Sequence, residues 1–268
     1  MSCVVALEPD GRATGVVAVG GRVLAVLEGV GGFTLLALET LRSGLRRGFP
    51  LREVAVQFEA IAVRSLSIVL VTAVFTGMVL ALQTTVSLAP FGLKLYTGSF
   101  VGLAFILELG PVLTALMVSG RVGAGIAAEL GSMAVTEQVD AMRTMGADPV
   151  QKLVLPRVLA ATFALPLLTI LADVLGILGG MLIAFQAGIT PDFYIRTVVT
   201  VVGIPDLLQA VAKTFFFGWT IAMVGCYMGL KTTGGTVGVG VSTTRAVVVA
   251  SIAVFVLDFF LTKLMIML

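Results

Sequence analysis

Five apolar runs, each long enough to cross a lipid bilayer, constrain this chain more than any other feature. They cover residues 67–88, 99–120, 158–185, 214–230 and 246–262. A hydrocarbon core of about 30 Å requires roughly 20 apolar residues in a helix. Inside lipid, every backbone N–H and C=O group must be paired within the protein, which favours helices. The runs therefore predict an all-α integral membrane protein with five transmembrane helices.

The composition agrees with this fold class. The chain is 58% hydrophobic and 12% charged, whereas soluble domains are about 25% charged. Its net charge of +2 is too small to indicate binding to nucleic acid.

Several kinds of catalytic site are excluded by the residues that the sequence lacks. The chain has no histidine, the usual general base near neutral pH and the commonest metal ligand. It has no Gly-Lys dipeptide, so the P-loop pattern GxxxxGK[ST] is not present. Cys3 and Cys226 lie far apart and form neither a CxxC site nor a disulfide framework. We therefore expect a protein that is not itself an enzyme and holds no metal or cofactor.

The distribution of basic residues predicts the orientation. Segment 42–64 and the connections 121–157 and 231–245 hold eleven Lys and Arg residues. The opposite side holds four: Lys94, Arg196, Lys213 and Lys263. Because cytoplasmic segments carry an excess of Lys and Arg, we expect a cytoplasmic N-terminus and a periplasmic C-terminus.

Residues 23–41 and the run to Arg47 are apolar but interrupted by Glu28, Glu39 and several glycines. Two interpretations fit this pattern. The favoured one is a helix in the cytoplasmic interface with its arginines among the headgroups, and the other is a sixth span.

Three acidic residues fall near the middle of predicted spans: Glu108, Asp173 and Asp258. A charge at the bilayer centre costs about 2.5–3.5 kcal/mol on insertion scales, so such groups face the bundle interior or a wet cavity. For Asp173 and Asp258, structural pairing and a functional role are equally compatible with the sequence. For Glu108 we favour function, because Pro111 must disturb the helix beside it.

Glycines suggest two further local features. The pairs Gly176/Gly180 and Gly225/Gly229 have the spacing that allows close contact between helices. The segment "GGTVGVG", residues 234–240, is predicted to be a flexible turn.

The stretch at residues 128–156, "AELGSMAVTEQVDAMRTMGADPVQKLVLP", is the most polar passage of the apolar region. Within residues 134–145, Val135, Val139 and Met142 recur at helical spacing, Thr136 is a candidate cap, and "GADP" is a stop signal. A short amphipathic helix between two spans is therefore predicted. The periodicity alone leaves two interpretations open, a solvated loop and a docking element for a cytoplasmic partner.

The segment "ELGPVLTALMVSGRVGAGIAAELGSMAVTEQVDAMRTMGADPVQKLVLPRVLA" closely resembles the core of the MlaE-type permeases of lipid ABC transporters. "FTGMVLALQ", "KTFFFGWTIAMVGCYMGL" and "GGTVGVGVSTTRAVVVASIAVFVLDFFLT" are similar to other parts of that family. The resemblance covers roughly residues 40–265. It implies a permease domain over 31–268 and leaves residues 1–30 as an unassigned extension.

The resemblance implies a fold and a set of partners. Such permeases carry an N-terminal interfacial helix and five spans, form homodimers, and bind two cytoplasmic ABC ATPase subunits that hold ATP and Mg. A periplasmic MCE-domain protein receives or delivers the lipid. The helix between the second and third spans is the coupling helix that seats in the ATPase. The residues implied there are Glu137, Asp140, Arg143, Met145 and Asp148.

The resemblance also implies a phospholipid site that opens outward. Its residues would be Leu80, Leu88, Phe91, Glu108, Lys213 and Asp258. Acyl chains need an apolar wall, and a phosphate needs a cation, which Lys213 would supply near the outer mouth. Leu107 stands where a relative has arginine, so headgroup binding at that position must differ here.

The sequence therefore predicts the permease subunit of an ATP-driven phospholipid transporter in a bacterial inner membrane. One alternative is a permease of the same family for sterols or other hydrophobic lipids. A second is an ion-coupled secondary carrier that uses Glu108, Asp173 and Asp258 as a relay. A third, a membrane-embedded lipid enzyme, is disfavoured by the missing histidine.

Overall fold

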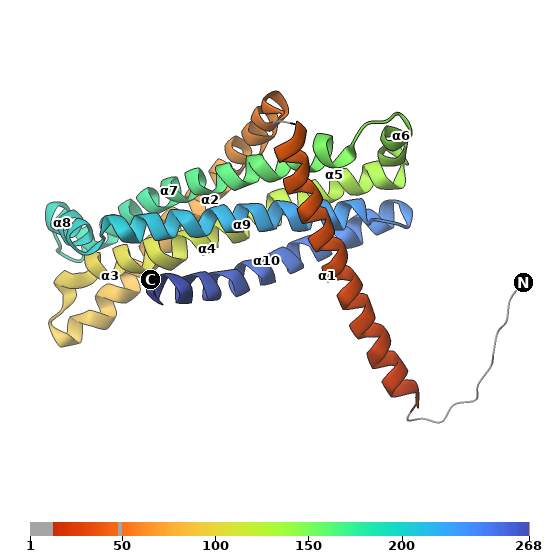
Figure 1. Cartoon of the computed structure of the whole chain (residues 1–268). Helices are drawn as coiled ribbons and strands as arrows, with labels where there is room; N and C mark the ends of the chain where they lie inside the picture. The colour runs from red at the N-terminus through yellow and green to blue at the C-terminus, as the bar shows by residue number, and fades with distance from the viewer. Residues whose placement is uncertain (1–12, 48–49, 268) are drawn as a thin grey trace, which may run out of the picture.

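The computed structural model describes residues 13–47 and 50–267, and all regular elements in these ranges are helical (Figure 1). Four long helices follow α1 (Ala13–Arg47): α2 (Leu51–Leu88), α7 (Leu155–Gln186), α9 (Ile204–Leu230) and α10 (Gly235–Met267). Three shorter ones, α3 (Thr97–Ala104), α4 (Gly110–Val118) and α5 (Ala124–Val135), are joined end to end by π turns at Phe105–Leu109 and Ser119–Gly123.

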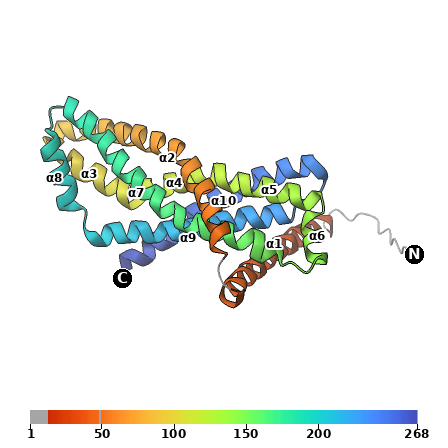
Figure 2. The same cartoon turned by 90° about the horizontal axis from the view of Figure 1, so that it is seen from above.

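The remaining elements are short and lie at the two ends of the molecule. Two 3₁₀ turns, Ala89–Phe91 and Lys94–Tyr96, connect α2 to α3. At the same end lies α8 (Pro191–Val201), whereas α6 (Gln138–Thr144) lies at the opposite end (Figure 2). A π turn at Val150–Val154 leads from α6 into α7.

Five continuous helical segments are long and apolar enough to cross a membrane, which confirms the predicted fold class. They are Leu51–Phe91, Lys94–Val135, Val150–Gln186, Ile204–Leu230 and Gly235–Met267. Each of the five predicted spans falls within one of them. The helices extend well beyond the apolar runs, and α2 begins sixteen residues before its run, in a stretch that includes Arg52, Glu53, Glu59 and Arg64.

The prediction of a flexible turn at 234–240 is wrong. Only Gly234 and Gly235 adopt the left-handed conformation, and α10 begins at Gly235. Glycine weakens a helix by about 1 kcal/mol per residue in water. At the edge of a bilayer, however, backbone groups must still be hydrogen-bonded, which favours continuing the helix.

Helix α1 crosses the long helices steeply instead of running beside them (Figures 1 and 2). It packs against α9, where Phe33 makes edge-to-face contacts with Trp219 and Tyr227. Among the described residues, α1 is not one of the segments that are long and apolar enough to span a membrane. That finding goes against the sixth span, and a location in the interface stays a prediction.

Glycines allow the long helices to touch through their backbones. A Cβ at Gly77 of α2 would overlap the carbonyl group of Gly176 in α7. Gly225 of α9 lies against the carbonyl of Gly123, at the end of the second π turn, and Gly229 lies against Leu130 and the Ala127 carbonyl of α5. The close helix contacts predicted from glycine spacing are therefore confirmed, and they hold the bundle around the site described next.

Candidate functional site

The second span departs from α-helical geometry beside Glu108. Residues Phe105–Leu109 form a π turn, in which the Gly110 N–H bonds to the carbonyl of Phe105. Pro111 follows and has no N–H, so the Leu107 carbonyl four residues earlier loses its helical donor. The disturbance predicted from Pro111 is confirmed, and it leaves a backbone oxygen free to accept a side-chain hydrogen bond.

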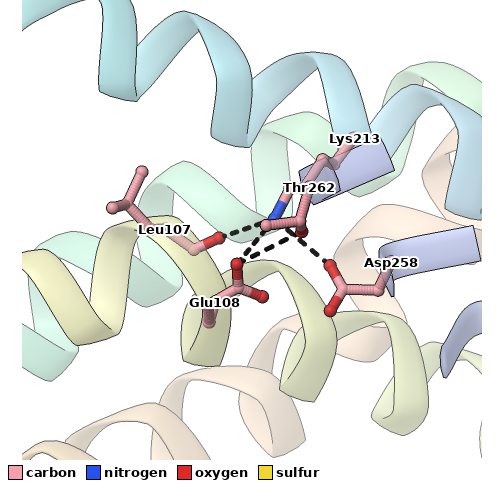
Figure 3. Close-up of polar contacts among 5 residues, drawn as sticks. All are labelled: Leu107, Glu108, Lys213, Asp258 and Thr262. Carbon is pink, nitrogen blue, oxygen red and sulfur yellow. Dashed lines mark hydrogen bonds and ion pairs between the residues drawn. The ribbon is translucent and has the colours of Figure 1, made fainter. Parts of the chain in front are cut away.

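Lys213 of α9 occupies this position (Figure 3). Its Nζ donates to Leu107 O at 3.1 Å and to Glu108 Oε1 at 2.9 Å. Asp258 Oδ1 of α10 lies 3.3 Å from the same Nζ and forms an ion pair without hydrogen-bond geometry. Three oxygen atoms therefore surround one ammonium group that is only 3% exposed.

The cluster carries more negative than positive charge. Two carboxylates face one lysine, and Thr262 donates a further hydrogen bond to Glu108 Oε1 at 3.3 Å. The Glu108 side chain is 43% exposed, whereas Lys213 is buried. The group that an incoming ligand meets first is therefore the Glu108 carboxylate.

A pocket of about 270 Å³ opens beside Glu108. Its apolar wall comes from Leu103, Leu107 and Ile266, and its polar wall also includes Gln209 and Thr262. A cavity with one apolar side and one charged side suits an amphiphile better than a simple ion.

The structure brings together only half of the predicted lipid-site residues. Glu108, Lys213 and Asp258 meet in the cluster. Leu80 packs on the core, Leu88 is partly buried, and Phe91 is 76% exposed. None of these three lines the pocket.

The predicted start of the fourth helix is wrong. The sequence placed Lys213 just before that span, but it lies inside α9, which begins at Ile204, and its location near the outer mouth stays a prediction. At 1.5 Å per residue, it is roughly 14 Å into the helix. The two carboxylates make a lysine at this depth tolerable, because charges inside a membrane are paired with one another.

Asp173, the third acid, makes no hydrogen bond or ion pair with the described residues of the cluster. It lies on α7 and is 7% exposed, with Oδ1 against Gly110. This oxygen has no hydrogen-bond partner within the described residues. A relay through Glu108, Asp173 and Asp258 therefore lacks a direct connection at Asp173.

At the opposite end of the molecule, α6 follows a sharp turn. Glu137 has a left-handed backbone conformation (φ 59°), and α6 begins at Gln138. The prediction that Thr136 caps this helix is wrong. Its hydroxyl donates back to Ser132 O at 2.8 Å, at the end of α5, so the hydroxyl closes the preceding helix instead.

The apolar side of α6 packs inward and its charged side faces outward. Val139 is 5% exposed, whereas Asp140 and Arg143 form an exposed ion pair of 2.9 Å. Met145 is 75% exposed just after the helix, and Asp148 Oδ1 accepts the Val150 N–H at 3.0 Å. The structure thus presents a compact, charged element at the tip of a membrane bundle.

Comparison with known proteins decides the family. A family model described as Permease MlaE matches residues 54–264, which include both the lysine cluster and α6. The chain belongs to the MlaE permease family.

Relatives of this MlaE-family chain are named as transporter permeases. A probable ABC transporter permease protein of Rickettsia felis is 37% identical over 92% of this chain and 95% of its own length. The intermembrane phospholipid transport system permease protein MlaE of Haemophilus influenzae is 34% identical over 92% and 96%. The chloroplastic protein TRIGALACTOSYLDIACYLGLYCEROL 1 of Arabidopsis thaliana is 38% identical over 77% of this chain and 59% of its own.

Three contributors to the site of this MlaE permease were missed in the sequence. Thr262 lies one helical turn from Asp258, and Gln209 one turn from Lys213, so the four-residue spacing could have indicated both. The Leu107 carbonyl could have been found from Pro111, because a proline removes the donor to the carbonyl four residues before it.

Proposed function

We propose that this permease is the membrane subunit of an ATP-driven phospholipid transporter. It moves lipid between a bacterial inner membrane and a periplasmic MCE-domain partner. Support comes from its family and from the name of the Haemophilus influenzae relative. Because the sequence contains no P-loop, ATP and Mg are bound by a separate ABC ATPase.

The observation that carries this proposal is the Lys213–Glu108–Asp258 cluster beside an amphipathic pocket. The ammonium is surrounded by oxygens at 2.9–3.3 Å inside segments long enough to span a membrane. Polar groups at such depth are expensive and mark substrate pathways. The family and the name of the Haemophilus influenzae relative support lipid as the cargo of this pathway.

A zwitterionic phospholipid matches the charges of this cluster. A phosphate alone would meet the exposed Glu108 carboxylate and be repelled. A headgroup with both phosphate and ammonium can open the Lys213–Glu108 ion pair and replace it with two new pairs, phosphate to Lys213 and ammonium to Glu108. Lys213 and Glu108 then each keep a partner of opposite charge, and the zwitterion adds no net charge, so the exchange is inexpensive.

The acyl chains would pass along Leu103, Leu107 and Ile266 and then over the outer part of α2, including Leu80, Leu88 and Phe91. We also propose that two copies assemble, with α10 near the shared axis. In a single chain, only 11% of the most apolar stretch of α10 is buried. The surface of this helix is therefore available to lipid and to a second copy.

The element that couples to the ATPase would be α6 with its flanking turns. Glu137, Asp140, Arg143 and Met145 are exposed at the tip of the bundle, and Asp148 is fixed at the start of the following π turn. This end would face the cytoplasm, as the distribution of basic residues predicts.

The test uses Glu108→Gln, which keeps the shape and the hydrogen bonds of the side chain but removes its charge. The purified complex is reconstituted with phosphatidylethanolamine, and retained lipid is counted by native mass spectrometry. We expect a loss of roughly 10-fold or more, the size of a charge-assisted hydrogen bond. Asp192→Asn, which removes an exposed carboxylate at the α8 end, is the matched control.

Any of three outcomes would count against the proposal. Unchanged lipid retention in Glu108→Gln would separate the cluster from the cargo. Loss of ATPase association in the same variant would show that Glu108 serves assembly. Retention of sterol in place of phospholipid would favour the other lipid class in this family.

A further inference from the structure

A second pocket, of about 300 Å³, lies between the start of α2 and the start of α7. Both helices end near α8, so their starts lie toward the α6 end of the molecule (Figure 2). The residues that line this pocket include Arg52, Glu53, Val56, Lys152, Leu153 and Arg157. Nothing in the transport site described above uses these residues.

Positive charge is in excess in this pocket. Arg157 is almost fully buried and already paired, with Glu129 Oε1 at 2.8 Å and Leu153 O at 2.6 Å. Arg52 and Lys152 differ, because neither has an ion pair or hydrogen bond with a described side chain. Two exposed cations without carboxylate partners therefore face the same cavity, against the single carboxylate of Glu53.

The backbone adds to this preference for anions. Helix α2 begins at Leu51, and no side chain caps its first turn. The free N–H groups at a helix start carry a partial positive charge and attract phosphate and carboxylate groups. Arg52 and the start of α2 thus act on the same side of the pocket.

The other wall is apolar, which distinguishes a lipid from a soluble anion. Val56, Leu153 and Pro156 provide it. The pocket also lies at the ends of two segments that qualify as spans, Leu51–Phe91 and Val150–Gln186. Membrane-water interfaces lie at the ends of spanning helices, so a lipid of the adjacent leaflet can reach this pocket.

An acidic side chain of a docked ATPase is the rival occupant. In both views α6, the element proposed to dock, lies farther out toward the end of the molecule than the start of α2 (Figures 1 and 2). The apolar wall also has no use in binding a carboxylate from a soluble protein. These two observations favour lipid.

We propose that this pocket binds the phosphate of an anionic phospholipid from the leaflet on the α6 side. Arg52 and Lys152 contact the phosphate, and Val56 and Leu153 contact the upper acyl chain. The site is separate from the Lys213 cluster and does not depend on what the permease transports.

The experiment compares nanodiscs of pure phosphatidylcholine with nanodiscs containing phosphatidylglycerol, using the full complex. Lipid that stays bound after extraction is counted by native mass spectrometry. Arg52→Gln and Lys152→Gln should each weaken phosphatidylglycerol retention roughly fivefold, the effect of one basic residue near a membrane surface. The double variant should lose it almost completely. The matched control, Lys94→Gln with Arg196→Gln, removes the same charge at the α8 end and should leave retention unchanged.

A photoactivatable phosphatidylglycerol provides a second measurement on the unmodified chain, and it should label peptides that contain Val56 and Leu153. Equal retention of both lipids, or labelling elsewhere, would overturn the proposal. Binding of inorganic phosphate without lipid retention would overturn the lipid assignment. Loss of the ATPase from the double variant with lipid retained would assign the pocket to the ATPase instead.

Discussion

Two acid–base ion pairs of this permease, one exposed and one largely buried, have different roles. At α6, Asp140 and Arg143 pair at 2.9 Å with their side chains about two-thirds exposed. In the bundle, Lys213 pairs with Glu108 at the same 2.9 Å but is 3% exposed. Exposed pairs contribute about 0–1 kcal/mol, whereas removing one member of a buried pair costs about 3–5 kcal/mol.

The comparison separates structure from recognition. The α6 pair stabilises the fold very little, so its charges are available to a partner. The Lys213 cluster is held by its neighbours, and a ligand reaches it first through the exposed side of Glu108. Substitutions at the two places should therefore have opposite signatures, one in stability and one in binding.

The largest effect should come from Lys213→Met, which leaves Glu108 and the Leu107 carbonyl without their lysine donor and Asp258 without its cation. We expect a loss of about 3–5 kcal/mol in the free energy of unfolding. Thermal unfolding in detergent, followed by circular dichroism, measures it. Arg196→Met, which breaks the exposed pair with Asp192, should change stability by less than about 1 kcal/mol. Equal effects of the two substitutions would remove the distinction made above.

A backbone contact between two of the long helices should be nearly as sensitive. Gly77→Ala inserts a methyl group into the carbonyl of Gly176, between α2 and α7. Overpacking of this kind costs about 1–3 kcal/mol, and the same unfolding assay reports it. Gly120→Ala, where a Cβ meets open space, is the control, and it should not destabilise the protein. A tolerated Gly77→Ala would show that α2 and α7 are not held at backbone contact.

The exposed pair should show the reverse pattern. Exchanging its charges with Asp140→Arg and Arg143→Asp keeps an ion pair and should change stability by no more than about 0.5 kcal/mol. Association with the ATPase should nevertheless be lost, because complementary charge at an interface is sensitive to sign. Co-purification measures this association. Retained association would mean that these two side chains do not face the partner.

Within the cluster, the smallest effect is expected at Thr262, its neutral member. Thr262→Val removes one hydrogen bond to Glu108 and should cost about 0.5–1.5 kcal/mol. Lipid retention should change less than in Glu108→Gln, since the charge of Glu108 remains. A larger loss than in Glu108→Gln would place Thr262, rather than the carboxylate, in contact with the headgroup.

The lengths of the apolar runs were enough to predict the five spans, because the thickness of the bilayer sets a minimum length for any spanning helix. The ends of the helices were harder to predict. Arg52, Glu53 and Glu59 give the start of α2 a polar surface, although the helix continues through them. Helix α8 was missed entirely, although Thr190, Pro191 and Asp192 form a recognisable helix start.

The sequence identified the charged residues of the site but not how they pack together. Glu108 and Asp258 were identified as costly acids within spans, but their meeting with Lys213 depends on the packing of three separate segments. Lys213 was placed outside the membrane because it lies just before the apolar run 214–230. Hydropathy treats each residue separately and does not register that two carboxylates neutralise it. The outward-facing charges of α6, by contrast, followed from periodicity alone.

The most direct test of the central claim is purification of the detergent-solubilised protein from its native membrane, with identification of bound proteins and lipids. The account predicts a P-loop ATPase and phospholipid together with the permease. It also predicts that exchanging the charges of Asp140 and Arg143 removes the ATPase while the lipid stays. Recovery of the chain alone under mild conditions, without any ATPase, would contradict the account and favour a carrier driven by ions.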